Sequence, residues 1–281
     1  MEARILTPTY LTRFSAALRA AEKSAATVEK YARDAAAFAA YAAGGEVTKE
    51  LAVSWKSKLR EEGYTARSVN AMLAGVNGLF AFLGWHDLRV KTLKLQREIF
   101  CPEEKELTKD EYARLVRAAK EKQNERLSLI LQTICGTGIR VSELSFITAE
   151  AARRGEATVS CKGKTRSVFL VRDLQKKLLR YAEERGILSG SLFLTRGGKP
   201  IDRTSVWREM KALCEEARVD PRKVFPHNLR HLFARVFYGL EKDIAKLADL
   251  LGHSNINTTR LYIVSTGAEH RRRMERMRLI L

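Results

Sequence analysis

Apolar residues recur at spacings of three and four through most of the chain, and this period restricts the fold class more than any other feature of the sequence. Such spacing places apolar side chains on one face of an α-helix. The stretch 24–43 shows the pattern with Val28, Tyr31, Ala35, Phe38 and Tyr41. The stretches 8–21, 48–62 and 65–83 resemble it, and we expect the first part of the chain to be a unit of four helices.

The rest of the chain is also predicted to be helical, with one exception. A helix is expected to begin near residue 107, because Thr108 suits the N-cap and Glu111 the third helical position of a capping box. Further helices are expected at 125–135, 140–147, 172–185, 204–218, 228–239, 243–251 and 267–281, with a turn or helix reaching residue 262. The stretch 157–170 instead predicts two short strands around the basic turn at 162–164. The predicted fold class is mainly α with a small β-hairpin.

The helical period fails between residues 86 and 106, where charged and single apolar residues alternate and Pro102 occurs. This pattern is typical of an extended linker. The predicted domain organisation is a helical domain over 1–86, a linker over 87–106 and a second domain over 107–281.

The formal net charge is +18 and the pI is near 9.9, so the chain carries a large excess of Lys and Arg. Their mutual repulsion is relieved when a polyanion binds, and nucleic acid is the first candidate. An anionic membrane is the weaker one, because no apolar run approaches the length of a membrane span and the N-terminus lacks a signal pattern. The four cysteines show no metal-ligand spacing and are typical of reduced thiols in a cytosolic protein.

Two motifs in the second half concentrate cationic and imidazole side chains. In TGIRVSEL, the glycine and the Gly136 that precedes the motif turn the backbone tightly before Arg140, and Glu143 lies one turn later, where it could hold the arginine. In PHNLRH, His227, Arg230 and His231 share one helix face. An ordinary surface arginine and a structural histidine pair remain alternatives. A zinc site is disfavoured because Arg230 would repel the ion, whereas an arginine fork suits a phosphate.

A third motif, LLGHSNINTTRLY, places Tyr262 nine residues after His253. Taken alone, the tyrosine suits a core position and the histidine a helix cap. They occur, however, together with two arginines, a further histidine pair and the lysine of a basic turn in the second domain of a cationic chain. At this point a core tyrosine and a nucleophilic tyrosine are both open.

The order and spacing of these three motifs resemble the tyrosine recombinase (phage integrase) family over about residues 107–263. The resemblance implies an α+β catalytic domain after a helical core-binding (SAM-like) domain, and a last helix that docks on a neighbouring subunit. In that family the tyrosine forms a 3′-phosphotyrosyl bond with DNA, without metal or other cofactor.

The resemblance also implies roles for individual residues. Tyr262 would be the nucleophile, Arg140 and Arg230 the phosphate clamp, His227 the proton acceptor and His253 a further donor to the phosphate. Lys162 would protonate the departing oxygen, with Lys164 as its rival. Supporting roles would fall to Glu143 and His231.

The implied partners are duplex DNA with specific recombination sites, three further copies of the chain in a tetramer on two duplexes, and an accessory DNA translocase or directionality factor. The expected place of action is the cytoplasm, at the nucleoid. Candidate DNA contacts are the basic side chains of Lys56, Lys58, Arg67, Lys164, Lys199, Arg203 and Arg208. Strand relaxation by a type IB topoisomerase and DNA binding without catalysis are the alternative functions.

Overall fold

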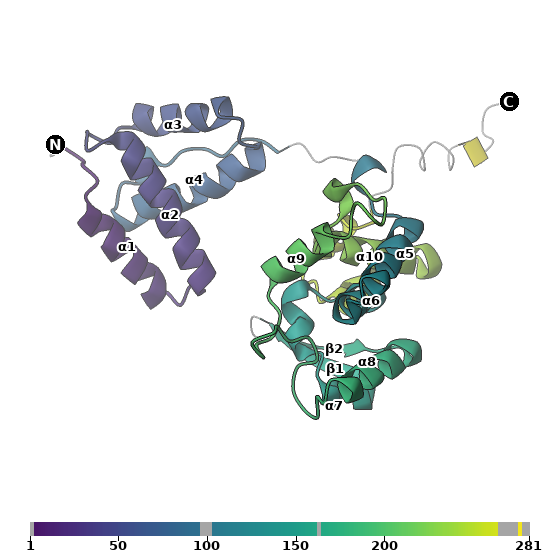
Figure 1. Ribbon diagram of the computed structural model, residues 1–281. Helices are drawn as coiled ribbons and strands as arrows, with labels where there is room; N and C mark the ends of the chain where they lie inside the picture. Colours follow the sequence, from purple (N-terminus) through teal and green to yellow (C-terminus); the bar gives the residue numbers. More distant parts are fainter. Residues whose placement is uncertain (1–2, 96–102, 162–163, 264–274, 277–281) are drawn as a thin grey trace. The chain divides into compact units, whose positions relative to one another are not determined.

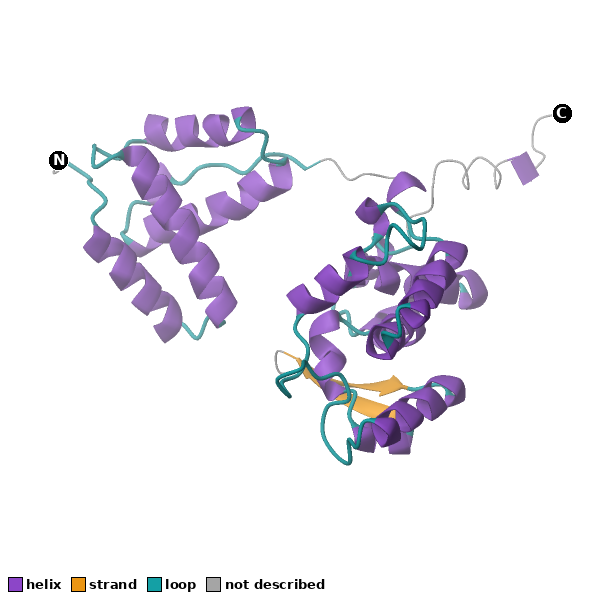
Figure 2. Cartoon of the chain, in the orientation of Figure 1, coloured by secondary structure: helices purple, strands orange, loops and turns teal. Residues whose placement is uncertain are grey.

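The computed structural model describes residues 3–95, 103–161, 164–263 and 275–276, and the chain divides into two units between Arg97 and Glu98 (Figure 1). Helices dominate both units, and the strands are confined to the second (Figure 2). The predicted fold class, mainly α with a small β-hairpin, is confirmed. No helix among the described residues is long and apolar enough to cross a membrane.

The first unit contains the four predicted helices. They are α1 (Pro8–Ala20), α2 (Ala25–Ala42), α3 (Lys49–Glu61) and α4 (Ala66–Phe82). Ser24, Thr48 and Thr65 begin the last three, since each side chain accepts a hydrogen bond from a backbone N–H of the first turn. In the core, the Phe38 ring meets Trp55 and Phe80 at centroid distances of 5.3 and 5.5 Å.

The segment predicted to be a linker begins as part of the first unit. After a short 3-10 turn (η1, His86–Leu88), Leu88 and Val90 are each only 4% exposed. Two asparagines of α4 bond to the backbone that follows: Asn77 to Val90 at 2.8 and 2.9 Å, and Asn70 to Leu93 at 2.7 and 2.9 Å. Each amide supplies both a donor and an acceptor, so it replaces the neighbouring strand that an extended backbone would otherwise need.

The second unit surrounds a separate apolar core. Its elements are η2 (Glu103–Lys105), α5 (Lys109–Glu121), α6 (Glu125–Thr137), η3 (Val141–Phe146), α7 (Ala149–Arg154), β1 (Glu156–Cys161), β2 (Lys164–Phe169), α8 (Arg172–Glu184), α9 (Arg203–Lys211), η4 (Pro221–Lys223), α10 (Pro226–Glu241), α11 (Ile244–Leu251) and α12 (Ile256–Arg260). The predicted capping box is present at the start of α5. The two strands pair antiparallel, with Glu156 opposite Phe169.

Two local predictions differ from the structure, and a third falls mostly outside the described residues. The six-residue α7 was not predicted, because its length is below that at which a helical period can be recognised. The predicted helix 204–218 ends at Lys211, since Leu213 and Cys214 bond back three residues rather than four, to Met210 and Lys211. The predicted last helix, 267–281, lies outside the described residues except at 275–276.

Candidate active site

Arg230 forms the centre of the site. It lies on α10 and is only 1% exposed. One terminal nitrogen, Nη1, donates to the carbonyl oxygen of Gly138, and the other, Nη2, lies 2.7 Å from the carbonyl of Leu251 and 3.0 Å from Nε2 of His253. The Nε of Arg230 is buried without a hydrogen-bond partner. The guanidinium is therefore held by main-chain oxygens, which fix its plane, and no carboxylate of the described residues pairs with it.

Gly138 at the end of α6 is required by this arrangement. Its φ is +67°, a region that L side chains rarely adopt, and a Cβ added there would lie 2.5 Å from the ring of Phe233. Glycine alone allows the carbonyl of residue 138 to reach Arg230 at this close approach of α6 and α10.

Arg140 is held by the buried carboxylate of Glu143. Nη1 of Arg140 lies 2.9 Å from one oxygen, Oε1, while the other oxygen, Oε2, accepts hydrogen bonds from the Arg140 backbone N–H at 2.8 Å and from Arg166 Nη2 at 2.6 Å. The Glu143 side chain is 2% exposed and that of Arg140 is 38% exposed. One carboxylate thus orients two guanidinium groups, and the Arg140 side chain stays open to solvent, where a phosphate could reach it.

Tyr262 lies among these groups in the same chain. It follows α12 and is 6% exposed. Its ring stacks on His231 at a centroid distance of 4.2 Å and lies 5.2 Å from His227 and 5.1 Å from His253. The guanidinium carbon of Arg230 is 5.8 Å from the ring centroid. The phenol and the groups that could activate it are therefore already assembled.

Buried Thr259 orients His253. The Thr259 hydroxyl lies 2.9 Å from Nδ1 of His253, whose Nε2 faces Arg230. Because the guanidinium is a donor only, Nε2 accepts from it and Nδ1 carries the proton that is donated to Thr259. The tautomer of His253 in the DNA-free chain follows from these two contacts.

All three histidines of the site are uncharged at neutral pH. For His227 and His253, burial is the main cause of a lowered pKa, and the positive charges of Arg230 and Arg140 are the next largest. The pKa of His227 is lowered, and that of His253 falls to about 4. Burial and the nearby His227 lower the pKa of His231 to about 3. Burial and the charge of Arg140 lower the pKa of Arg230 to about 10, so it remains protonated at pH 7. The site therefore combines fixed positive charge with neutral imidazoles that can accept a proton.

The structure brings together most of the residues predicted for the site: Arg140, Glu143, His227, Arg230, His231, His253 and Tyr262. Lys162 lies outside the described residues, and Lys164 is described only as the first residue of β2. Among the described residues, no third metal-ligating side chain joins the pair formed by His227 and His231.

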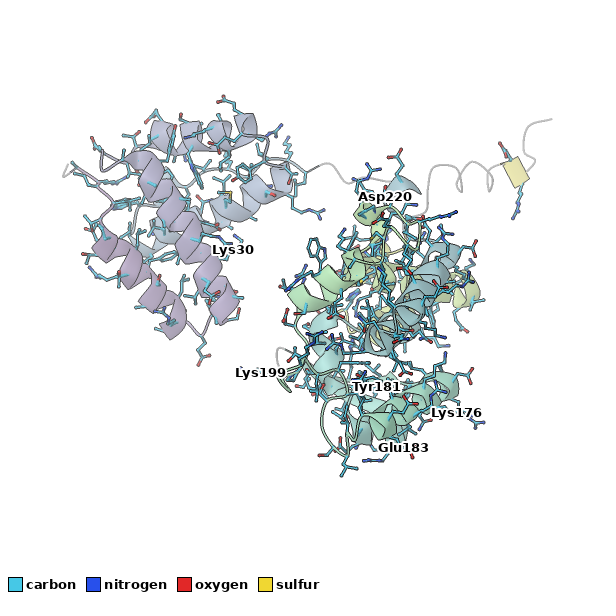
Figure 3. All side chains as sticks on the ribbon, in the orientation of Figure 1. Lys30, Lys176, Tyr181, Glu183, Lys199 and Asp220 are labelled. Carbon is cyan, nitrogen blue, oxygen red and sulfur yellow. The ribbon has the colours of Figure 1, made fainter. Side chains whose placement is uncertain are left out.

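The predicted DNA contacts lie on helices and loops of both units. Arg67 in α4 and Arg203 and Arg208 in α9 are exposed, as is Lys199 in the loop before α9 (Figure 3). The charge of Arg203 contributes to the lowered pKa of His227, which places the start of α9 near the site.

On α3 the candidate lysines already have partners within the first unit. Lys58 lies 3.7 Å from the carboxylate of Glu62, and Lys56 donates to the carbonyl of Lys91 at 3.4 Å.

Two residues of the site were not predicted. Thr259 lies three residues before Tyr262, so its helical spacing could have placed it on the same side of α12. Arg166 shares a strand face with Val168, which is 3% exposed, and a charged residue on an apolar face needs a buried partner.

Comparison with known proteins agrees with this arrangement. A family profile described as "Phage integrase family" matches residues 105–269, and one described as "Phage integrase, N-terminal SAM-like domain" matches residues 11–87. The chain is 29% identical over 290 residues to tyrosine recombinase XerA of Pyrococcus furiosus, covering 100% of this chain and 98% of that protein. It is 30% identical to tyrosine recombinase XerA of Thermococcus kodakarensis, covering 84% of each.

Solved structures share the fold. A lambda integrase tetramer bound to a Holliday junction matches with a TM-score of 0.75 at 18% identity, over 93% of this chain and 78% of that one. A crystal structure of XerA recombinase matches with a TM-score of 0.55 at 24% identity, over 97% and 99%. Since the family profile spans more than half of the sequence and includes the arginines, the histidines and Tyr262, the chain belongs to the phage integrase family, the tyrosine recombinases.

Proposed function

We propose that the chain is a site-specific DNA recombinase that cuts and rejoins strands through a covalent bond between Tyr262 and a 3′-phosphate. The observation that carries the proposal is the position of the Tyr262 ring, which lies between three neutral imidazoles and a buried guanidinium of its own chain. Its relatives are named tyrosine recombinases. Solved structures of similar fold include a lambda integrase dimer bound to a COC′ core site and XerH site-specific recombinase bound to difH substrate.

In the proposed cleavage step, the Tyr262 oxygen attacks phosphorus, its bond to the phosphate forms and the bond to the 5′ oxygen breaks. A phenol with a reference pKa of about 10 needs a base at neutral pH. His227 is proposed to accept its proton, which is supported by the 5.2 Å distance between the two rings and by the lowered pKa of this histidine. The 5′ hydroxyl that leaves, or that of a partner strand, reverses the step. Energy stored in the phosphodiester is therefore kept for rejoining.

Arg140 and Arg230 stabilise the transition state in this proposal. Negative charge grows on the non-bridging oxygens as the pentacovalent phosphorus forms, and donors fixed in advance need no reorganisation at that moment. His253 adds a hydrogen bond to the same oxygens in its other neutral tautomer, in which Nε2 carries the proton and Nδ1 accepts from the Thr259 hydroxyl. His231 supports the Tyr262 ring by stacking.

Covalent trapping tests the proposal. A duplex with a nick just 3′ of the scissile phosphate loses a short oligonucleotide on cleavage, so the reverse step cannot occur. The protein is expected to form a denaturant-resistant adduct in which mass spectrometry places the nucleotide on Tyr262. Binding without any adduct would instead identify a non-catalytic DNA-binding protein, and relaxation of supercoiled DNA without exchange between sites would identify a topoisomerase.

The proton for the departing 5′ oxygen is proposed to come from Lys162. A substrate with sulfur in place of that oxygen needs no acid, because a thiolate leaves unaided. We expect Lys162→Ala to cleave the normal bond slowly and the sulfur-containing bond at the wild-type rate. Lys164→Ala is the matched control in the same turn and should respond equally to both substrates. The reverse pattern would assign the role to Lys164.

The active assembly is proposed to be a tetramer on two duplexes, in which residues beyond Val264 dock on a neighbouring copy. Leu261 at the end of the described chain is 57% exposed and Leu240 at the end of α10 is 80% exposed, as expected for surfaces covered by a partner. Truncation after Val264 is expected to spare binding to a single site and to abolish pairing of two sites in a gel-shift assay. Normal recombination by the truncated chain would contradict this proposal.

The exposed cations of α9 and of the preceding loop, with Arg67 of the first unit, are proposed to contact DNA phosphates. Such contacts fix position rather than read sequence. The proposed substrate is chromosomal, plasmid or mobile-element DNA in the cytoplasm, with an accessory translocase or directionality factor as a further partner.

A further inference from the structure

Arg166 on β2 is the residue that joins the separate parts of the site. Its side chain is 14% exposed and pairs with Glu143 at 2.6 Å. Its other terminal nitrogen, Nη1, donates to the carbonyl oxygen of Leu250 at 3.1 Å. Arg166 thus contacts both the carboxylate that holds Arg140 and the end of the helix that precedes His253.

The end of α11 carries two guanidinium caps. The carbonyl of Leu250 accepts from Arg166 and that of Leu251 accepts from Arg230. Cations stabilise the last carbonyls of a helix because these groups lack partners within it and carry partial negative charge. Gly252 follows in a left-handed conformation, and a Cβ added there would lie 2.5 Å from Cδ of Arg166. The turn leading to His253 is therefore packed directly on the Arg166 side chain.

These contacts form a closed ring of hydrogen bonds, here called the circuit. Arg230 bonds to Gly138, two residues before Arg140; Arg140 pairs with Glu143; Glu143 pairs with Arg166; and Arg166 caps α11, whose last residue bonds again to Arg230. Arg166 is the member of the circuit that lies outside the three sequence motifs. Its removal would open the circuit between Glu143 and α11.

The charge of Glu143 is divided between two arginines. With Arg166 on Oε2, the Arg140 side chain contacts Oε1 through one nitrogen, so its remaining donors are free for a phosphate. Without Arg166, Arg140 would be the remaining cation bonded to the buried Glu143 carboxylate, and its guanidinium would be drawn toward that carboxylate.

From these contacts we infer that Arg166, anchored on the end of α11, is a positioning residue that holds Arg140 in its phosphate-binding orientation. This inference rests on the proposed function. It assigns Arg166 an effect on cleavage that is exerted through Arg140 rather than through its own contact with DNA.

A double-mutant cycle tests the inference. Arg166→Ala is expected to bind a single site with near-normal affinity and to cleave the nicked duplex about 10- to 100-fold more slowly, as loss of a supporting contact typically does. Combined with Arg140→Ala, it should add little further loss, because the residue through which it acts is already absent. Arg166→Lys, which keeps the charge near Glu143, should recover part of the rate.

Arg114→Ala is the matched control. Arg114 also bonds through its guanidinium to two backbone carbonyls, those of Ala217 and Arg218, at 2.9 and 3.3 Å. It should lower thermal stability without changing the cleavage rate of the folded protein. Multiplicative losses in the double mutant, or a rate for Arg166→Ala equal to that of Arg114→Ala, would overturn the inference. Absence of any adduct with the wild-type chain would instead refute the proposed function.

Discussion

Tyr262→Phe is expected to bind DNA normally and to form no covalent adduct. Phenylalanine keeps the ring that stacks on His231 at 4.2 Å, so the packing around α12 is retained. It lacks the oxygen that would bond to phosphorus, and no other group in the site replaces that oxygen in the proposed mechanism. The measurement is the fraction of nicked duplex that remains attached to protein after denaturation, set beside a gel-shift titration of the same variant.

Tyr238→Phe is a suitable control for this substitution. Tyr238 is a partly buried tyrosine of α10 in the same small apolar cluster, and Lys242 lies over its ring at 5.6 Å. Its loss of a hydroxyl should leave adduct formation unchanged. Persistent adducts with Tyr262→Phe would show that another residue is the nucleophile.

Arg230→Ala is expected to slow cleavage about 100- to 1,000-fold, which is the usual cost of removing one preorganised donor to a developing anion. The guanidinium carries a fixed charge in a buried position, where electrostatic stabilisation is stronger than in water. Single-turnover cleavage of the nicked duplex measures the effect. With a neutral methylphosphonate at the scissile position, the difference from wild type should shrink, because there is less charge to neutralise.

Arg230 also bonds to the carbonyls of Gly138 and Leu251, so alanine could disturb the fold as well as the chemistry. Arg230→Lys separates these effects, because lysine keeps the positive charge but lacks the planar guanidinium that contacts both carbonyls. Thermal melting of each variant reports on the fold. A folded Arg230→Ala variant that cleaves the normal phosphate at the wild-type rate would exclude the clamp role.

Local patterns predicted much of the fold, because its long helices have clear periods and caps. The capping box of Thr108 and Glu111 and the helix face shared by His227, Arg230 and His231 followed from spacing alone. The spatial meeting of PHNLRH with LLGHSNINTTRLY depends on packing between α10 and the residues after α11, and spacing does not contain that information. It came from the family resemblance.

The residues that were missed depend on long-range contacts. Arg166 lies 23 positions from Glu143 and 84 from Leu250, so no local pattern relates them. The contacts between α4 and the start of the predicted linker were missed for a similar reason. Val90 and Leu93 bond through their backbone to asparagine side chains on α4, and such bonds leave no periodic signal.

Tyr262 lies beside the histidines and arginines of its own polypeptide, and this arrangement limits how the cleavage activity of an assembly of such chains can be regulated. Each copy holds Tyr262 together with the histidines and the arginine proposed to act on it, so mixing a copy that lacks the tyrosine with one that lacks the arginine would not restore cleavage under this proposal. The order in which strands are cut would then depend on inactivating whole subunits one after another, because each subunit contains its own nucleophile.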